Sequence, residues 1–232
     1  VFFYDERGSK LFERITRLPE YYLTRTEKEL IKVAAAENRE ELKNSDIVEI
    51  GSGDSSKISI LLEAVPQNFI ESIHYIPVDI SYAALKESSS KLLDSFEGLN
   101  IHALVADFVK QLNVIPDGGK RIVCFFGSTL GNFSRTKAQS FISELGDFMK
   151  SGDILFLGLD MIKSTAVLEN AYNDSQNVTA EFNCNILNVL NSIAATDFNL
   201  SSFRHIAFYN DKEHRIEMYL EAEKDMEISW PY

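Results

Sequence analysis

A short apolar segment that runs into a glycine turn constrains the fold of this chain more than any other feature. Residues 46–57 read DIVEIGSGDSSK, an apolar stretch of strand length followed at once by a Gly-x-Gly turn. A second stretch, HYIPVD, ends in the carboxylate of Asp79 about one strand–helix–strand unit later. This order of strand, glycine turn, helix and acidic strand end indicates an open α/β sheet that holds an adenosine-containing cofactor.

The middle of the chain continues this alternation of strand and helix patterns. Helical patterns lie between the apolar stretches, at residues 57–65, 81–95 and 134–149, and Ser81 is a good N-cap for the second of them. The predicted strands are residues 46–50, 74–79, 100–107, 121–127 and 153–160. Strands that alternate with helices predict parallel βαβ units with helices on both faces of the sheet. We therefore predict a nucleotide-type core over residues 27–162.

Both ends of the chain depart from this alternation. Residues 1–26 are rich in Tyr, Phe, Arg and Glu, and residues 163–200 have helical patterns. FRHIAFYN and RIEMYLEAE then alternate as the two strands of a hairpin, joined by the polar DKEH. We expect residues 1–26 and 163–232 to form a second lobe over the carboxyl ends of the core strands, where such folds bind ligands. The chain opens at Val1 rather than at Met, so we expect further residues before it.

Composition excludes several classes of function. The net charge is -12 and the pI is about 4.8, and the 23 basic residues are scattered among 35 acidic ones, which argues against nucleic acid as a partner. No apolar run approaches the roughly 18 residues of a membrane helix. The two cysteines have no CxxC partner and the four histidines are not grouped, so we expect no metal. The cysteines indicate buried free thiols in a reducing cytoplasm. We further expect a monomer that acts on a small-molecule amino-acid substrate.

The glycine turn itself favours one kind of cofactor. Gly51 and Gly53 let the backbone approach a ligand closely, but the third glycine of a GxGxxG fingerprint is missing. A turn with no pyrophosphate to hold fits S-adenosylmethionine, and a plain strand–helix turn is the alternative. Asp79 could accept hydrogen bonds from two ribose hydroxyls, although an isolated aspartate at a strand end is more often simply solvated.

Two further strand ends carry polar groups. Asp107 could accept from an adenine amino group while Phe108 flanks the ring, or Asp107 could only cap a helix. GSTLGN, residues 127–132, provides two glycines, two hydroxyls and an amide that could orient a small polar substrate, or could only form a capping turn. Aromatic residues in the flanks usually belong to a core, but a cluster of them would stabilise a charged amine: Tyr4, Phe12, Tyr21, Tyr22, Tyr172 and Phe182.

The same residues occur in an order that resembles one family over nearly the whole chain. The most specific string is YDERGSKLFERITRLPEYYLTRTE at 4–27, followed by EIGSGDSSK at 49–57, PVDIS at 77–81, ADF at 106–108, FFGSTLGNF at 125–133, LGLDMIK at 157–163, AYND at 171–174, VTAEFNCNIL at 178–187 and RIEMYL at 215–220. These closely resemble the histidine N-alpha-methyltransferases of ergothioneine biosynthesis. A related fungal branch methylates the amine of dimethylallyltryptophan.

The resemblance implies a fold, a reaction and a set of site residues. The fold is a Rossmann-like class I methyltransferase parallel sheet with an added substrate-binding lobe from both chain ends. The reaction transfers methyl groups from S-adenosylmethionine to the α-amine of histidine, up to the trimethylated betaine hercynine. The implied cofactor-binding residues are Gly51, Ser52, Gly53, Lys57, Asp79, Asp107 and Phe108. Tyr4 and the Gly127 carbonyl would lie at the reacting amine, with Phe12 facing the growing ammonium. Asn132 and Tyr172 would hold the substrate carboxylate, while Tyr21 and Met218 would line the pocket.

The family reads the imidazole through a Glu-x-Ser-x-x-aromatic pattern. Here Glu227, Ser229 and Tyr232 fit that pattern, but sooner after RIEMYL than the family leads us to expect. The same comparison predicts two more core strands beyond the end of this sequence. Mechanistically we expect Tyr4 to accept or relay the proton of the amine, because no His or Lys in a site motif is an obvious base.

Three rival functions follow from the same residues. The first is methylation of another amine such as a tryptophan derivative, which would need an apolar pocket in place of Glu227 and Ser229. The second is a nicotinamide-dependent oxidoreductase, against which the missing third glycine and the lack of an acid–base residue for hydride transfer argue. The third is a binding protein that retains an inactive methyltransferase fold, against which four intact residues argue: Asp79, Asn132, Tyr4 and Tyr172.

Overall fold

The computed structural model describes residues 3–230 and forms two compact units. One unit is Thr26–Asp160, and the other combines Val1–Arg25 with Met161–Tyr232. Sequence patterns placed the corresponding boundaries at residues 27 and 162. The second unit is therefore built from segments that are far apart in the sequence.

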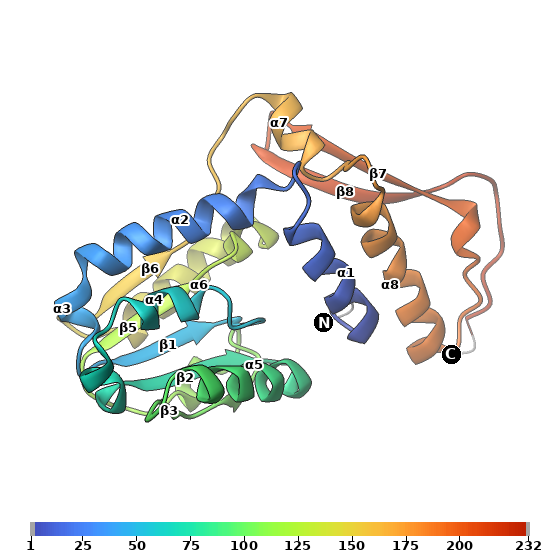
Figure 1. Ribbon diagram of the computed structural model, residues 1–232. Coiled ribbons are helices and arrows are strands. Elements are labelled where there is room, and N and C mark those ends of the chain that lie inside the picture. The colour runs from blue at the N-terminus through green and yellow to red at the C-terminus, as the bar shows by residue number, and fades with distance from the viewer. Residues whose placement is uncertain (1–2, 231–232) are drawn as a thin grey trace. The chain divides into compact units, whose positions relative to one another are not determined.

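The unit Thr26–Asp160 contains a six-stranded sheet in which every pairing is parallel (Figure 1). The strand order is β3-β2-β1-β5-β6, with β4 also paired to β2. The strands are β1 (Asp46–Ile50), β2 (His74–Asp79), β3 (Asn100–Ile101), β4 (Leu104–Val105), β5 (Arg121–Phe125) and β6 (Ile154–Leu157). The predicted parallel α/β core is confirmed.

The single strand predicted over residues 100–107 was wrong in its length, because the structure splits it into β3 and β4. Tyr75 pairs with Ile101 and Val78 pairs with Leu104, so the gap lies opposite Pro77. The carbonyls of Tyr75 and Asp79 face this side of the sheet, where they accept from His102 and Ala106. Residue 77 faces the same side and, as a proline, has no N–H to donate. The ladder therefore breaks at the missing donor.

Helices cover both faces of this sheet. The helices that follow strands begin close to their predicted positions, and Ser81 and Ser134 cap two of them by accepting from Ala84 and Lys137. The helical elements are α2 (Tyr22–Glu37, in this unit from Thr26 on), α3 (Arg39–Leu42), α4 (Ile58–Glu63), η1 (Gln67–Ser72), α5 (Tyr82–Ser95), η2 (Leu112–Val114), η3 (Thr129–Asn132) and α6 (Arg135–Phe148).

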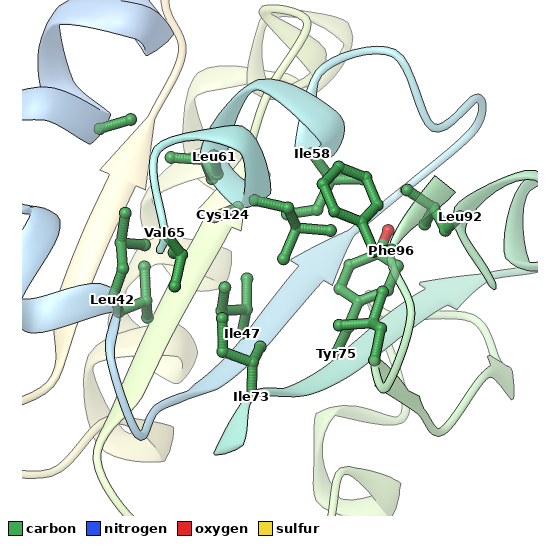
Figure 2. Close-up of a cluster of buried hydrophobic side chains, with 14 of the residues drawn as sticks. Leu42, Ile47, Ile58, Leu61, Val65, Ile73, Tyr75, Leu92, Phe96 and Cys124 are labelled. Atoms are coloured by element: carbon green, nitrogen blue, oxygen red, sulfur yellow. The ribbon is translucent and has the colours of Figure 1, made fainter. Parts of the chain in front are cut away.

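Alternate residues of each strand face two separate apolar clusters. Figure 2 shows Ile58 and Leu61 of α4 over Ile47, Tyr75 and Cys124 of the sheet. The other face buries the intervening positions against α6, and its core includes Val48, Ile50, Val123, Phe125, Phe141 and Leu145. Because both faces are covered, β1 and β5 are buried along their whole length.

The other unit joins three helices to a β-hairpin. Its elements are α1 (Glu6–Thr16), α7 (Thr165–Asn170), α8 (Val178–Ala194), η4 (Leu200–Ser202), β7 (Phe203–Asn210) and β8 (Arg215–Ala222). β7 and β8 are antiparallel, which confirms the predicted hairpin. Asp5 caps α1 by accepting from Gly8. The core of this unit is Leu11, Ile15, Leu18, Tyr21, Ala171, Val178 and Phe182.

Candidate active site

The glycine turn after β1 is tied to the end of β2. Gly51 and Gly53 have φ of +68° and +53°, in the left-handed region that glycine adopts without strain. The N–H of Gly51 donates to the Val78 carbonyl at 2.8 Å, and the N–H of Gly53 donates to Oδ2 of Asp79 at 3.2 Å. A Cβ added to Gly53 would meet no atom within 4 Å. The turn is thus held rigidly on its inner side and has open space at Gly53.

Asp79 is oriented by two backbone donors. Its Oδ1 accepts from the N–H of Ser81 at 2.8 Å, and its Oδ2 accepts from Gly53. Each carboxylate oxygen can accept a further hydrogen bond, so both remain available to hydroxyl donors. The neighbouring Ser52 hydroxyl is buried and has no hydrogen-bond partner among the described residues. A buried polar atom without a partner is one that a bound polar ligand can satisfy.

Phe108 lies beside the glycine turn, whereas the Asp107 carboxylate binds residues of its own loop. The Phe108 ring would lie 3.5 Å from a Cβ at Gly51, and it packs edge-on against Phe125 and Phe141. Asp107 accepts from the N–H of Val109 at 3.1 Å and pairs with Lys110 at 3.2 Å. The structure therefore brings Gly51, Phe108 and Asp79 to one edge of the sheet. The local contacts of Asp107 stabilise a turn over residues 108–110, and no helix begins there.

The turn after β5 is held by a residue that sequence analysis did not single out. Gly127 and Ser128 have φ of +80° and +54°, and Asn132 is exposed at the end of η3. The N–H of Gly127 donates to Oε1 of Glu27 at 2.6 Å. Oε2 of Glu27 pairs with Nζ of Lys57 at 2.7 Å, with 16% and 20% of the two side chains exposed. Lys57 and Gly127 thus share one carboxylate.

A second acidic residue missed by the sequence analysis is buried under the glycine turn. Glu49 on β1 is 2% exposed and accepts from the Tyr75 hydroxyl at 2.5 Å. Burial raises the pKa of Glu49 to about 8, against the lowering effect of the Tyr75 hydrogen bond and of Lys57. Burial, and then Glu49, raise the pKa of the Cys124 thiol well above its usual range. A carboxyl group in the middle of an apolar strand pattern was the signal available in the sequence.

In the other unit the structure brings aromatic rings from several segments into contact. Tyr4 contacts Phe12 edge-on at 5.6 Å between ring centroids, and both contact Phe182 at 5.7 and 5.9 Å. Phe12 also contacts Tyr21 at 6.3 Å, and Tyr21 contacts Tyr172 at 6.0 Å. Tyr4, Phe12, Tyr21 and Tyr172, which the resemblance places around the substrate, therefore form one continuous cluster. Phe182 at its centre was noted in the sequence analysis without a site role.

The backbone of Tyr172 is fastened to the hairpin by two side chains. Nε2 of His205 lies 2.9 Å from the Tyr172 carbonyl, and Nδ2 of Asn173 donates to the Ala207 carbonyl at 3.0 Å. Because a carbonyl oxygen only accepts, His205 carries its proton on Nε2. Its Nδ1 then accepts from Nδ2 of Asn183, which also donates to the Tyr219 carbonyl. Ala207 pairs with Met218 in the hairpin register, so Met218 lies opposite this fastening.

Ser229 and Glu227 lie in the extended segment after β8. Ser229 donates from both its N–H and its hydroxyl to Asp197, each at 2.8 Å. These two hydrogen bonds lower the pKa of Asp197. Glu227 is exposed. The aromatic end of their sequence pattern, Tyr232, lies outside the described residues.

Comparison with known proteins decides what this arrangement belongs to. A family model described as a histidine-specific, S-adenosylmethionine-dependent methyltransferase matches residues 1–232. This chain belongs to that family. The histidine N-alpha-methyltransferase of Mycobacterium tuberculosis is 40% identical over 95% of this chain, and that of Mycolicibacterium smegmatis is 41% identical over 95%. The chain spans 68% of the length of each of these two relatives.

A solved structure supports the fold. The mitomycin 7-O-methyltransferase MmcR aligns with a TM-score of 0.54 over 99% of this chain and 59% of its own, at 16% identity. At 16% identity the similarity is evidence of the fold alone. It confirms the predicted class I methyltransferase sheet. The resemblance stated from sequence motifs is confirmed by the family match. An oxidoreductase on this fold is therefore ruled out.

Membership of this methyltransferase family makes S-adenosylmethionine the cofactor. The residues of the glycine turn fit it. The unpartnered hydroxyl of Ser52, the open space at Gly53 and the spare acceptors of Asp79 are what an adenosine cofactor requires at a strand end. No three His, Cys, Asp or Glu residues within 3–230 group as metal ligands, and no helix in that range is long and apolar enough to cross a membrane.

Proposed function

We propose that this protein transfers methyl groups from S-adenosylmethionine to the α-amine of L-histidine, up to the trimethylated product. The observation that carries the proposal is the aromatic cluster of Tyr4, Phe12, Tyr21, Phe182 and Tyr172, in a chain of the histidine-specific family. Aromatic rings stabilise a cation at their faces, and each methyl transfer leaves a positive charge on the nitrogen, which becomes permanent after the third.

The two units have separate roles in this proposal. The unit Thr26–Asp160 binds the cofactor through Gly51, Ser52, Gly53 and Asp79, with Lys57, Asp107 and Phe108 as further contacts. Gly127 and Asn132 of the same unit serve the amine and the carboxylate of the substrate. The other unit supplies the aromatic cluster, together with Met218, Glu227 and Ser229 as pocket residues.

The cofactor supplies a methyl group bonded to a positively charged sulfur. The protein must hold the amine in its neutral form, because a free α-amine is mostly protonated near pH 7. Tyr4, 49% exposed and in edge contact with Phe12, takes up the departing proton or passes it to water. Phe12 faces the nitrogen as it becomes an ammonium. Fixed orientation contributes most of the rate, since near-attack placement is worth up to about 7–11 kcal/mol in the best intramolecular models.

Repeated methylation requires the substrate to keep its position while the amine loses its hydrogen-bond donors. The carboxylate of the amino acid does not change between rounds, so its contacts supply a constant anchor. Tyr172 suits that role because His205 and the neighbouring Asn173 fix its backbone to the hairpin. The Ser229 hydroxyl donates its hydrogen bond to Asp197, so the Ser229 oxygen can still accept one from an imidazole N–H.

A substrate panel tests the proposal. The protein is incubated with S-adenosylmethionine and, separately, histidine, tryptophan, a prenylated tryptophan and a mixture of the other amino acids, and products are read by mass spectrometry. We expect methylated histidine and no methylated tryptophan. Methylation of the tryptophan compounds alone would replace histidine by the rival amine, and cofactor binding with no methylated product in any sample would favour an inactive binding protein.

We also infer that the protein acts as a monomer in the cytoplasm on a free amino acid. Its two cysteines are free thiols, and Cys124 is completely buried, which suits a reducing compartment. Light scattering on the purified protein tests the oligomeric state, and a dimeric mass at working concentration would contradict it.

A further inference from the structure

Glu27 contacts two turns at the edge of the sheet, one after β1 and one after β5. One carboxylate oxygen accepts from the N–H of Gly127 after β5, and the other pairs with Lys57 at the end of the glycine turn. Both side chains of the ion pair are largely buried, with 16% and 20% exposed. Lys57 immediately precedes α4, so the pair fixes the point where the turn becomes a helix.

The backbone around Glu27 is shaped to admit its carboxylate. A Cβ added to Gly158, just after β6, would lie 2.0 Å from Oε1 of Glu27 and 3.3 Å from Cα of Phe126. A Cβ added to Gly127 would lie 3.1 Å from Nζ of Lys57. Neither position could carry a larger residue without moving the ion pair. Three chain segments that follow β1, β5 and β6 thus converge on one carboxylate.

Glu29, two residues after Glu27 on the same helix, provides a comparison. Glu29 also lies on α2 and also pairs with a lysine, Lys32, at 2.7 Å, but 71% and 55% of those side chains are exposed. Exposed pairs of this kind contribute little to stability, and their side chains reach no turn. Glu27 therefore differs from Glu29 in its contacts with the two turns and not in its charge.

We propose that Glu27 is a positioning residue for methyl transfer, acting through Lys57 on the cofactor and through Gly127 on the turn that serves the reacting amine. The role of Glu27 through Gly127 rests on the proposed function, because it concerns the reacting amine. Its role through Lys57 rests only on membership of the methyltransferase family. Without Glu27, Lys57 is free to change rotamer and the Gly127 N–H loses its acceptor. Both the affinity for cofactor and the rate of methyl transfer then fall.

The experiment compares Glu27→Gln with Glu29→Gln. The amide oxygen of Glu27→Gln can still accept from Gly127, so this variant removes chiefly the charge that holds Lys57. Binding of S-adenosylhomocysteine is measured by calorimetry, kcat and KM are measured for both substrates, and thermal unfolding is recorded. We expect Glu27→Gln to weaken S-adenosylhomocysteine binding and to lower kcat, each about tenfold, while Glu29→Gln matches the wild type.

A double variant separates positioning from stability. Glu27→Gln combined with Lys57→Met removes both charges, so no unpaired charge stays buried and the thermal midpoint recovers. Because Glu27 acts on the cofactor through Lys57, positioning predicts that Glu27→Gln costs little further affinity for S-adenosylhomocysteine once Lys57 is methionine, so the double variant binds about as well as Lys57→Met alone. Affinity losses that simply add in the double variant would overturn the proposal.

A third variant guards against failure of Glu27→Gln to fold. Gly158→Ala displaces the Glu27 carboxylate without changing any charge, and we expect it to reproduce the loss of affinity. Wild-type affinity in both Glu27→Gln and Gly158→Ala would likewise overturn the proposal. Because calorimetry with S-adenosylhomocysteine needs no methyl acceptor, this result is independent of whether histidine is the substrate.

Discussion

The Tyr75 hydroxyl on β2 donates a hydrogen bond of 2.5 Å to the carboxyl group of Glu49 on β1. Both side chains are buried, at 1% and 2% exposed, on the face of the sheet that packs against α4. Burial is the main reason that the pKa of Glu49 rises from 4.5 to about 8. A protonated carboxyl group is therefore part of the folded protein at neutral pH, two residues before Gly51 of the cofactor turn.

This pair predicts how stability depends on pH. Between about 4.5 and 8 the folded protein keeps the Glu49 proton while the unfolded chain has lost it. The folded state then binds more protons, so its free energy of unfolding falls as pH rises through this window. In Glu49→Gln the amide oxygen accepts from Tyr75 without titrating, and we expect a flatter pH profile. Urea unfolding of both proteins across the window measures the difference, and identical slopes would show that Glu49 does not titrate as described.

Asp79 provides a test of the cofactor site. Asp79→Ala removes the acceptors for the ribose hydroxyls and releases the N–H of Gly53. We expect S-adenosylmethionine to bind at least about tenfold more weakly, a loss of about 1.4 kcal/mol. Calorimetry measures the affinity, and Asp94→Ala, at an exposed position on α5, is the matched control. Equal affinity in the two variants would return Asp79 to the role of a solvated strand end.

Tyr172 and Asn132 are expected to act on the substrate and not on the cofactor. Tyr172→Phe keeps the ring contact with Tyr21 and loses only the hydroxyl, and Asn132→Ala loses an exposed amide. Each variant should raise the KM for histidine about tenfold while the affinity for S-adenosylmethionine stays near that of the wild type. Steady-state kinetics with each substrate varied in turn provide the measurement. Unchanged histidine kinetics in both variants would defeat the assignment.

His205 is predicted to act on histidine binding through the backbone of Tyr172. His205→Phe keeps a ring on β7 but removes the donor to the Tyr172 carbonyl and the acceptor for Asn183. We expect the KM for histidine to rise several-fold with little change in cofactor affinity. His102→Phe, at an exposed position in the other unit, is the control. If both variants show the same KM, the fastening of Tyr172 does not matter for substrate binding.

Hydrophobic periodicity made much of this fold predictable. β1 and β2 were predicted residue for residue, because each is a short, mainly apolar stretch followed by turn residues or a helix N-cap. The hairpin alternates with period two around a polar loop, and its two strands were also predicted. The break between β3 and β4 was not predicted, because it depends on the missing N–H of Pro77 in the neighbouring strand. The periodicity of residues 100–107 carries no information about that residue.

The site residues divide along similar lines. Gly51 and Asp79 stand in strand-turn patterns that carry their own signal, and the motif resemblance named the aromatic residues. Glu27 ends the motif string of residues 4–27, but the motif gave it no role. Only the fold shows that Glu27, and not Glu29, contacts Gly127 and Lys57. Its role depends on contacts with residues 30 and 100 positions away along the chain.

The central claim is that the α-amine of histidine receives the methyl groups. The most direct measurement uses S-adenosylmethionine labelled with ¹³C in its methyl group, with histidine as acceptor, and locates the label in the product by NMR correlation to the neighbouring carbon. We predict that every labelled methyl group correlates with the α-carbon and that the final product is trimethylated. Label that correlates with the imidazole carbons, or histidine that stays unlabelled while another amine is labelled, would contradict this account.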